Sequence, residues 1–70
     1  MLPLTYAELG EEGIISRISG TADEKKRMEQ LGVHVGCRVK LVSLVGTDFI
    51  LNVNDARIAI GRELAEKIMI

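Results

Sequence analysis

The sequence has one cysteine, one proline, no tryptophan and only two aromatic residues, Tyr6 and Phe49. One cysteine cannot form a disulfide within the molecule, and one cysteine with one histidine cannot supply a four-ligand structural metal site. The scarcity of rings argues against a groove for proline-rich peptides and against a barrel that stacks nucleic acid bases. No apolar run approaches the ~20 residues of a membrane span.

An excess of charge of one sign is also missing. The 70 residues carry a net charge of −1, and acidic and basic residues are interspersed. The chain therefore has no positive field to attract phosphate backbones or anionic lipid, and we expect no nucleic acid partner and no direct membrane insertion. Because the N-terminus lacks the basic and apolar regions of a signal peptide, we expect a cytoplasmic protein with a reduced thiol.

Hydrophobic residues are plentiful, at 47%, and nearly all are aliphatic. The clearest local signal among them starts a helix from Ala22 to about Leu31. Thr21 and Glu24 have the spacing of a capping box, and acidic residues occupy the first turn. The same Thr-x-x-Glu spacing at Thr5 to Glu8, followed closely by Gly10, predicts a single capped helical turn.

The end of the main helix is marked as clearly as its start. Gly32 suits the left-handed position that follows a last helical turn. Val33 would then fold back on Met28 in the hydrophobic contact of a Schellman motif. We expect a short link and a strand to follow.

Alternation of apolar and polar residues predicts five short strands. The first spans Ile14 to Ser19, where either Ile14 and Ile18 face the core with Ser16, or Ile15 takes that side through a bulge. The other four are predicted at Cys37 to Leu41, Phe49 to Val53, Ala56 to Ile60 (with Ala56, Ile58 and Ile60 facing inward) and Ile68 to Ile70, with turns at Gly46-Thr47-Asp48 and Asn54-Asp55.

A second short helix, about Arg62 to Lys67, is predicted before the last strand. So small a sheet disposes of its edges by bending and closing on itself. We therefore predict a single domain over residues 1–70. It is a mainly β, SH3-like, five-stranded antiparallel barrel with one helix after the first strand and a short helix before the last.

Cys37 and His34 are the only candidates for a nucleophile and its base. Because Cys37 shares a strand face with Val39 and Leu41, we expect a small buried hydrophobe and neither catalysis nor a cofactor. His34-x-x-Cys37 would hold a transition metal only as half of a site that a second molecule completes. No metal site is assigned beyond these two half-site candidates. The function that the composition leaves open is that of a protein-binding module.

Several motifs, spread nearly end to end, resemble those of one family. The family's central motif is R-[LM]-x-x-[LM]-G-[LMF]-x-x-G, and it is similar to the run Arg27-Met28-x-x-Leu31-Gly32-Val33-x-Val35-Gly36. The motif at the end of the family's sequences is similar to Ile58-Ala59-Ile60 followed by Arg62, Glu63, Ala65, Ile68 and Ile70. On these residues the sequence resembles the FeoA family, small SH3-like domains that accompany the bacterial ferrous iron transporter FeoB. It departs from the pattern at Val35, where proline is common, at Gly61, where a basic residue is frequent, and in a shorter hairpin at 43–48.

The resemblance implies a cytosolic, non-enzymatic accessory of ferrous iron uptake that contacts the G-protein portion or the cytosolic gate of FeoB. The one basic run, Lys25-Lys26-Arg27, stands beside apolar residues whose role is otherwise unexplained. We therefore predict a partner-binding surface on the helix and the link, made of Lys25, Lys26, Met28, Glu29, Val33 and His34.

A rival interpretation is a metal-responsive sensing or regulatory module, because similar domains occur at the C-termini of metal-dependent repressors. The chain begins with Met1 and carries no helix-turn-helix, so we expect a separate polypeptide rather than a fused repressor. Weak self-association is compatible with either interpretation.

Overall fold

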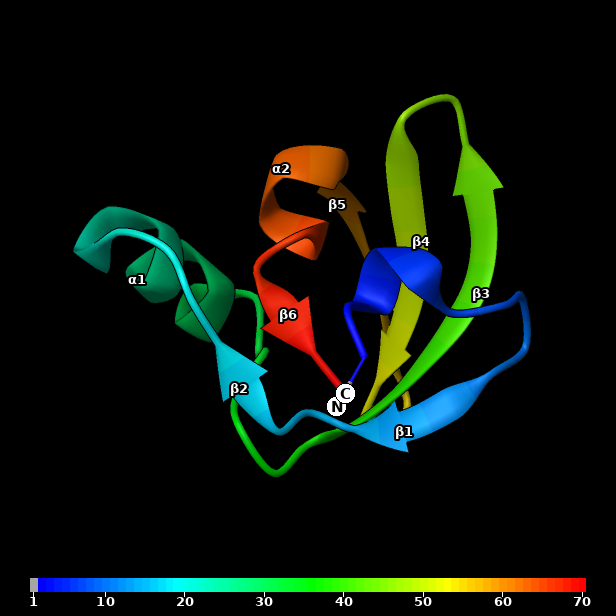
Figure 1. The fold of residues 1–70 in the computed structure, drawn as a ribbon, viewed down its shortest axis with the longest axis horizontal. Coiled ribbons are helices and arrows are strands. Elements are labelled where there is room, and N and C mark those ends of the chain that lie inside the picture. The colour runs from blue at the N-terminus through cyan, green and yellow to red at the C-terminus, as the bar shows by residue number, and fades with distance from the viewer. Residues whose placement is uncertain (1) are drawn as a thin grey trace.

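A computed structural model describes residues 2–70 (Figure 1). In chain order the elements are the 3₁₀ turn η1 (Leu4–Tyr6), β1 (Glu12–Ile14), β2 (Arg17–Ile18), α1 (Ala22–Gln30), β3 (Arg38–Val45), β4 (Asp48–Val53), β5 (Ala56–Gly61), α2 (Arg62–Ala65) and β6 (Ile68–Met69). One sheet has the order β1-β3-β4-β5, and β2 pairs with β6 in a second; all pairs are antiparallel. The mainly β, SH3-like prediction is confirmed, with six strands in two sheets in place of one closed five-stranded barrel.

The additional strand arises because the predicted first strand divides at Ile15. β1 pairs with β3, whereas β2 pairs with β6 at the other end of the chain. Between them, the Ile15 N–H donates to Cys37 O (2.9 Å) and Ile15 O accepts from the Gly36 N–H (2.8 Å). Ile15 is 1% exposed and Ile14 is 52% exposed. Of the two arrangements left open by the sequence, the one with Ile15 in the core is correct.

α1 begins at the predicted capping box. The Glu24 N–H donates to Thr21 Oγ1 (3.1 Å), and the Thr21 N–H donates to Glu24 Oε1 (2.8 Å). This backbone hydrogen bond from Thr21 lowers the pKa of the Glu24 carboxyl below its ordinary value. Gly20, at φ +112°, leaves room for the carboxylate, since a Cβ there would lie 2.8 Å from Glu24 Oε1.

α1 ends in the predicted Schellman motif. Gly32 takes φ +88°, its N–H donates to Glu29 O (2.9 Å), and the Val33 N–H donates to Met28 O (2.9 Å). Met28 is 0% exposed and Val33 is 1% exposed. The hydrophobic contact expected between helix and link therefore belongs to the core.

Two tight hairpins build the larger sheet. Gly46-Thr47 joins β3 to β4, and Asn54-Asp55, at φ +49° and +71°, joins β4 to β5. A register shift between Leu41 and Ser43 bends β3. On β5, Ile60 is buried and Ile58 half-buried as predicted, whereas Ala56 is exposed beside the turn.

The two ends of the described chain close the core. η1 lies where a single turn was predicted, but the Thr5 to Glu8 capping box is wrong, because no side chain caps η1 and the Glu8 N–H instead donates to Glu11 Oε1 (3.0 Å). Leu2 and Ile70 exchange two backbone hydrogen bonds, of 2.6 and 2.8 Å, so the two ends lie side by side (Figure 1).

The core is aliphatic apart from one ring. It consists of Leu4, Ile15, Met28, Val33, Val39, Leu41, Phe49, Leu51, Val53, Ile60, Leu64, Ala65 and Ile68. α2 is shorter than predicted and adds Leu64 and Ala65 to the core. Within residues 2–70, neither helix has the length and apolar character needed to cross a bilayer.

Candidate protein-interaction surface

The only cysteine and the only histidine lie on one turn. The Cys37 N–H donates to His34 O (3.1 Å), which closes the turn after Val33. The Cys37 thiol is half-buried, accepts from Asn54 Nδ2 (3.3 Å) and reaches Gly32 O at 3.9 Å. In the described part of the chain, no three His, Cys, Asp or Glu side chains gather as metal ligands would. The half-site of His34 and Cys37 remains a prediction, because its test requires a second molecule.

A hollow of about 200 Å³ lies among α1, β2 and the link that follows α1. We call it the α1 hollow; its lining residues are Ile18, Lys25, Glu29, Val33, His34 and Val35. Figure 1 shows α1 at one side of the molecule, across β2 from the larger sheet. The hollow is smaller than the ~300–1,000 Å³ of pockets that enclose drug-sized ligands, so it suits a side chain of a partner.

Most of the surface predicted from the sequence meets in this hollow. Lys25 and Glu29 come from successive turns of α1, and His34 comes from the link. Lys26 is exposed on α1 but does not line the hollow. Charged groups therefore surround an apolar floor, the arrangement usual at protein interfaces.

Two of the predicted surface residues are wrong as contact residues. Met28 is fully buried, and Val33 lies at the floor of the α1 hollow with only 1% of its surface exposed. The cause is the Schellman motif, which turns Val33 back onto the helix. The sequence led to both predictions for Val33, although a residue folded into the core cannot also present a surface.

Ile18 and Val35 also line the α1 hollow, and neither was among the surface residues predicted from the sequence. Val35 is 63% exposed, so its aliphatic side chain is open to solvent at the rim of this hollow. Val35 does not share the inward face of Val33, because it lies in the turn that the Cys37 N–H and His34 O close. Since Val33 was assigned to the helix contact, Val35 was the apolar residue left for the surface.

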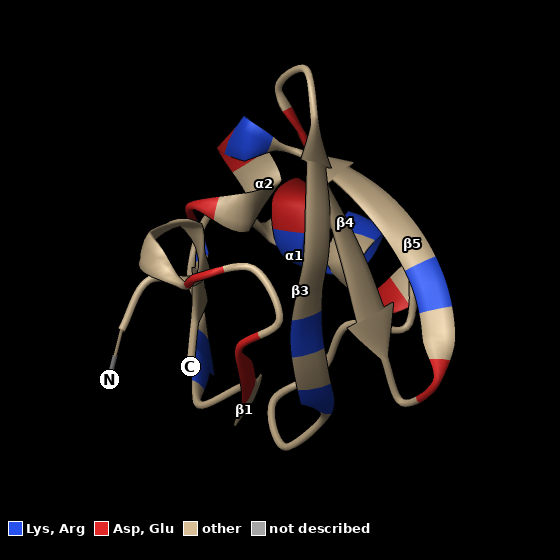
Figure 2. Cartoon of the chain, turned by 90° about the vertical axis from the view of Figure 1, so that its right-hand side faces the viewer, with Lys and Arg blue, Asp and Glu red and all other residues tan. Residues whose placement is uncertain are grey.

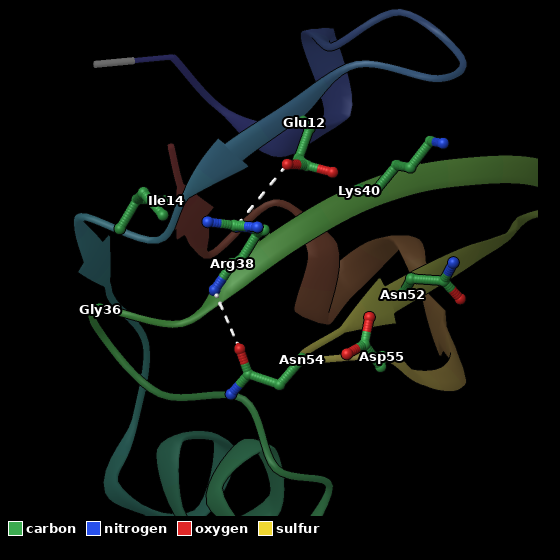
Figure 3. Close-up of a pocket in the computed structure, with 8 residues that line it drawn as sticks. All are labelled: Glu12, Ile14, Gly36, Arg38, Lys40, Asn52, Asn54 and Asp55. Atoms are coloured by element: carbon green, nitrogen blue, oxygen red, sulfur yellow. Dashed lines mark hydrogen bonds and ion pairs between the residues drawn. The ribbon is translucent and has the colours of Figure 1, made fainter.

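A larger hollow of about 510 Å³ lies on the outer face of the four-stranded sheet (Figure 3). It is lined by Glu12, Ile14, Gly36, Arg38, Lys40, Asn52, Asn54 and Asp55. Arg38 Nε lies 3.7 Å from Glu12 Oε1, and the Arg38 N–H donates to Asn54 Oδ1 (3.3 Å). Such exposed pairs contribute at most about 1 kcal/mol, and their opposite charges largely cancel. Its lining is mostly polar, with Ile14 as the one aliphatic residue, whereas Ile18, Val33 and Val35 all line the α1 hollow.

Charge elsewhere on the fold is mixed as well. Figure 2 shows acidic and basic segments distributed over both helices and the larger sheet, without a face of one sign. Two ion pairs lie within residues 2–70, Arg38 with Glu12 and Arg62 with Glu66. The structure thus presents no extended basic stripe of the kind that binds nucleic acid.

Two antiparallel sheets around one aliphatic core, with a helix set to the side, define a small SH3-like domain. The sequence model of the FeoA domain matches residues 2–70. A protein of Methanocaldococcus jannaschii, provisionally named Fe(2+) transport protein A, is 34% identical over 70 residues, which cover 100% of this chain and 85% of that protein. The chain belongs to the FeoA family, as its motifs predicted.

Solved structures agree with this assignment. The crystal structure of an iron uptake regulatory protein, FeoA, is 28% identical with a TM-score of 0.87, over 97% of this chain and 90% of that one. A manganese-dependent transcriptional repressor matches with a TM-score of 0.88 at 17% identity, over 94% of this chain and 38% of the repressor. At this identity the likeness to the repressor establishes a shared fold alone.

Proposed function

We propose that this protein is a cytosolic, non-enzymatic accessory of ferrous iron transport that binds the cytosolic part of a FeoB-type transporter. Membership of the FeoA family and the name of the M. jannaschii relative support the transport role. The observation that carries the binding role is the α1 hollow, an apolar depression with a charged rim. It lies beside a helix that offers most of its surface to a partner.

The exposure of α1 supports this surface in particular. Of the nine residues of α1, only Met28 is buried. A helix this short gains little stability from its own hydrogen bonds, so its capping box and Schellman motif compensate for sparse packing. The fold thus covers Met28 and leaves the polar face of α1 exposed beside the α1 hollow.

An apolar anchor of the partner is the natural occupant of the α1 hollow. Interfaces gain most of their binding energy from a few side chains that fill such depressions, while the polar rim sets orientation. Val35 at the rim would contact the anchor, and Lys25 and Glu29 would pair with groups of opposite charge on the partner. The protein then modulates transport only if it prefers one conformational state of the transporter over another.

The test compares two exposed apolar residues. Val35→Asp changes the rim of the α1 hollow, and Leu44→Asp is the matched control on the β3–β4 hairpin, at 52% exposure against 63% for Val35. We expect Val35→Asp to weaken binding to the purified cytosolic region of a FeoB-type transporter by at least ~10-fold, since a charge replaces an apolar contact. Binding would be followed by calorimetry, and thermal midpoints would be recorded for both variants.

Equal affinities for the wild-type protein and Val35→Asp would exclude the α1 hollow as the binding site. Loss of binding in Leu44→Asp alone would move the site to the hairpin. No binding by the wild-type protein would refute the proposed partner itself. A small thermal shift in both variants establishes that the comparison concerns binding and not folding.

A further inference from the structure

β5 is an outer strand of the four-stranded sheet. The two-residue turn at Asn54-Asp55 makes Val53 and Ala56 the closing hydrogen-bonded pair of the hairpin. Alternation along the ladder then directs the backbone groups of Ala56, Ile58 and Ile60 toward β4. Those of Arg57, Ala59 and Gly61 point away from the sheet. The β3–β4 hairpin gives the same phase, since its closing pair is Val45 with Asp48.

No other segment takes up this edge within residues 2–70. Figure 2 shows β5 as the outermost strand, with no ribbon beyond it. The backbone hydrogen bonds outside helices and strands involve none of Arg57, Ala59 and Gly61, and all three residues are exposed. Gly61 also precedes α2 as its N-cap, so its N–H is the group it offers at the edge.

This edge lacks most of the features that protect outer strands. Its register against β4 is continuous from Ala56 to Gly61, without a bulge, and it contains no proline. Of the three residues whose backbone points outward, Ala59 and Gly61 have the smallest side chains. Among these three residues, only Arg57 carries a charge that would disfavour pairing of this edge with another strand.

We propose that β5 pairs antiparallel with β5 of a second copy of this chain, about a two-fold axis at Ala59. In this register Ala59 lies opposite Ala59 of the other copy, and each Arg57 lies opposite Gly61. The two arginines are thereby kept apart, and each faces a residue without a side chain. A parallel pairing in register would instead place the arginines side by side, which like charges disfavour.

The placement of charge is what favours a second copy. About an axis at Ala59, Arg57 is the one charged residue whose backbone points outward, and it meets Gly61 of the other copy in both directions, so no like charges face each other. The contact is limited to one short strand from each copy, so it falls among the small, transient interfaces. No residue of the α1 hollow belongs to β5, so pairing and partner binding are separate properties.

The test uses the residue that faces itself. In Ala59→Lys and in Ala59→Glu, two like charges would meet at the axis, so each variant should be monomeric, while an equimolar mixture should form a heterodimer. Ala59→Val is the control that keeps the interface neutral. Ala59→Pro removes the outward N–H without removing a ladder bond and should weaken the dimer at least ~10-fold.

Sedimentation equilibrium up to about 1 mM protein gives the dissociation constants. Amide exchange at Arg57 and Ala59 should slow as the protein concentration rises. A monomeric wild-type protein at that concentration would overturn the proposal, and so would a dimer of Ala59→Lys as tight as the wild-type dimer. Failure of the Lys and Glu variants to pair with each other would exclude the axis at Ala59. If Ala59→Pro does not fold, the two charge variants still decide.

Discussion

Replacing Val33 with alanine tests whether the link after α1 is part of the core. Val33 is 1% exposed, and the substitution removes two methyl groups, each worth about 0.8 kcal/mol of burial. The cavity left behind raises the cost to about 2–3 kcal/mol. Because a domain of this size loses ~4–8 °C per kcal/mol, the thermal midpoint should fall by roughly 10–20 °C.

Val35→Ala is the matched control, since it makes the same chemical change two residues further along. Val35 is 63% exposed, so its replacement should alter the free energy of unfolding by no more than about 0.5 kcal/mol. Urea unfolding followed by far-UV circular dichroism gives both values, with unchanged m-values as the check for two-state behaviour. If Val33→Ala were as stable as Val35→Ala, the link would not be packed as described. The account of the α1 hollow would then fail as well.

Three further measurements address the helix and the metal question. Gly32→Ala should cost about 1–2 kcal/mol in urea unfolding, because φ is +88° there, and more than Gly61→Ala, where φ is −70°. The pKa of Glu24 is lowered in the folded state. The ionised carboxylate therefore stabilises the fold above the unfolded pKa of about 4.3, and this stabilisation is lost as pH falls through the folded pKa. Between pH 5 and 3, the thermal midpoint of Glu24→Gln should fall less than that of the wild-type protein. Calorimetry with Fe(II) should show no stoichiometric micromolar binding, since the described residues offer no cluster of three ligands; a clear one-to-one isotherm would favour the metal-responsive interpretation over the transport accessory.

Local signals in the sequence predicted the helix and the hairpins well. The capping box at Thr21 and Glu24 and the left-handed Gly32 depend on neighbouring residues only, and both are present in the structure. The alternation of Phe49, Leu51 and Val53 likewise places the three side chains in the core. In each case one short-range rule determines the conformation.

The division of the first strand could not be predicted from local signals. It depends on pairing β1 with β3 and β2 with β6, and the residues of the second pair lie about fifty positions apart in the chain. The same dependence on tertiary structure explains why only part of the α1 hollow was predicted. Lys25 and His34 were found because they lie on the helix and link, whereas Ile18 comes from a strand that only the tertiary fold brings there.

The hydrogen bonds between Leu2 and Ile70 have a practical consequence for engineering. Because these two residues already touch, a few glycines would join them into a circular backbone. New ends could then be opened at the exposed Gly46-Thr47 turn, which belongs to the β3–β4 hairpin and not to α1. Such a circular permutant would carry fluorescent or affinity tags at the tip of the β3–β4 hairpin, at the side of the molecule away from α1 and the proposed binding surface (Figure 1).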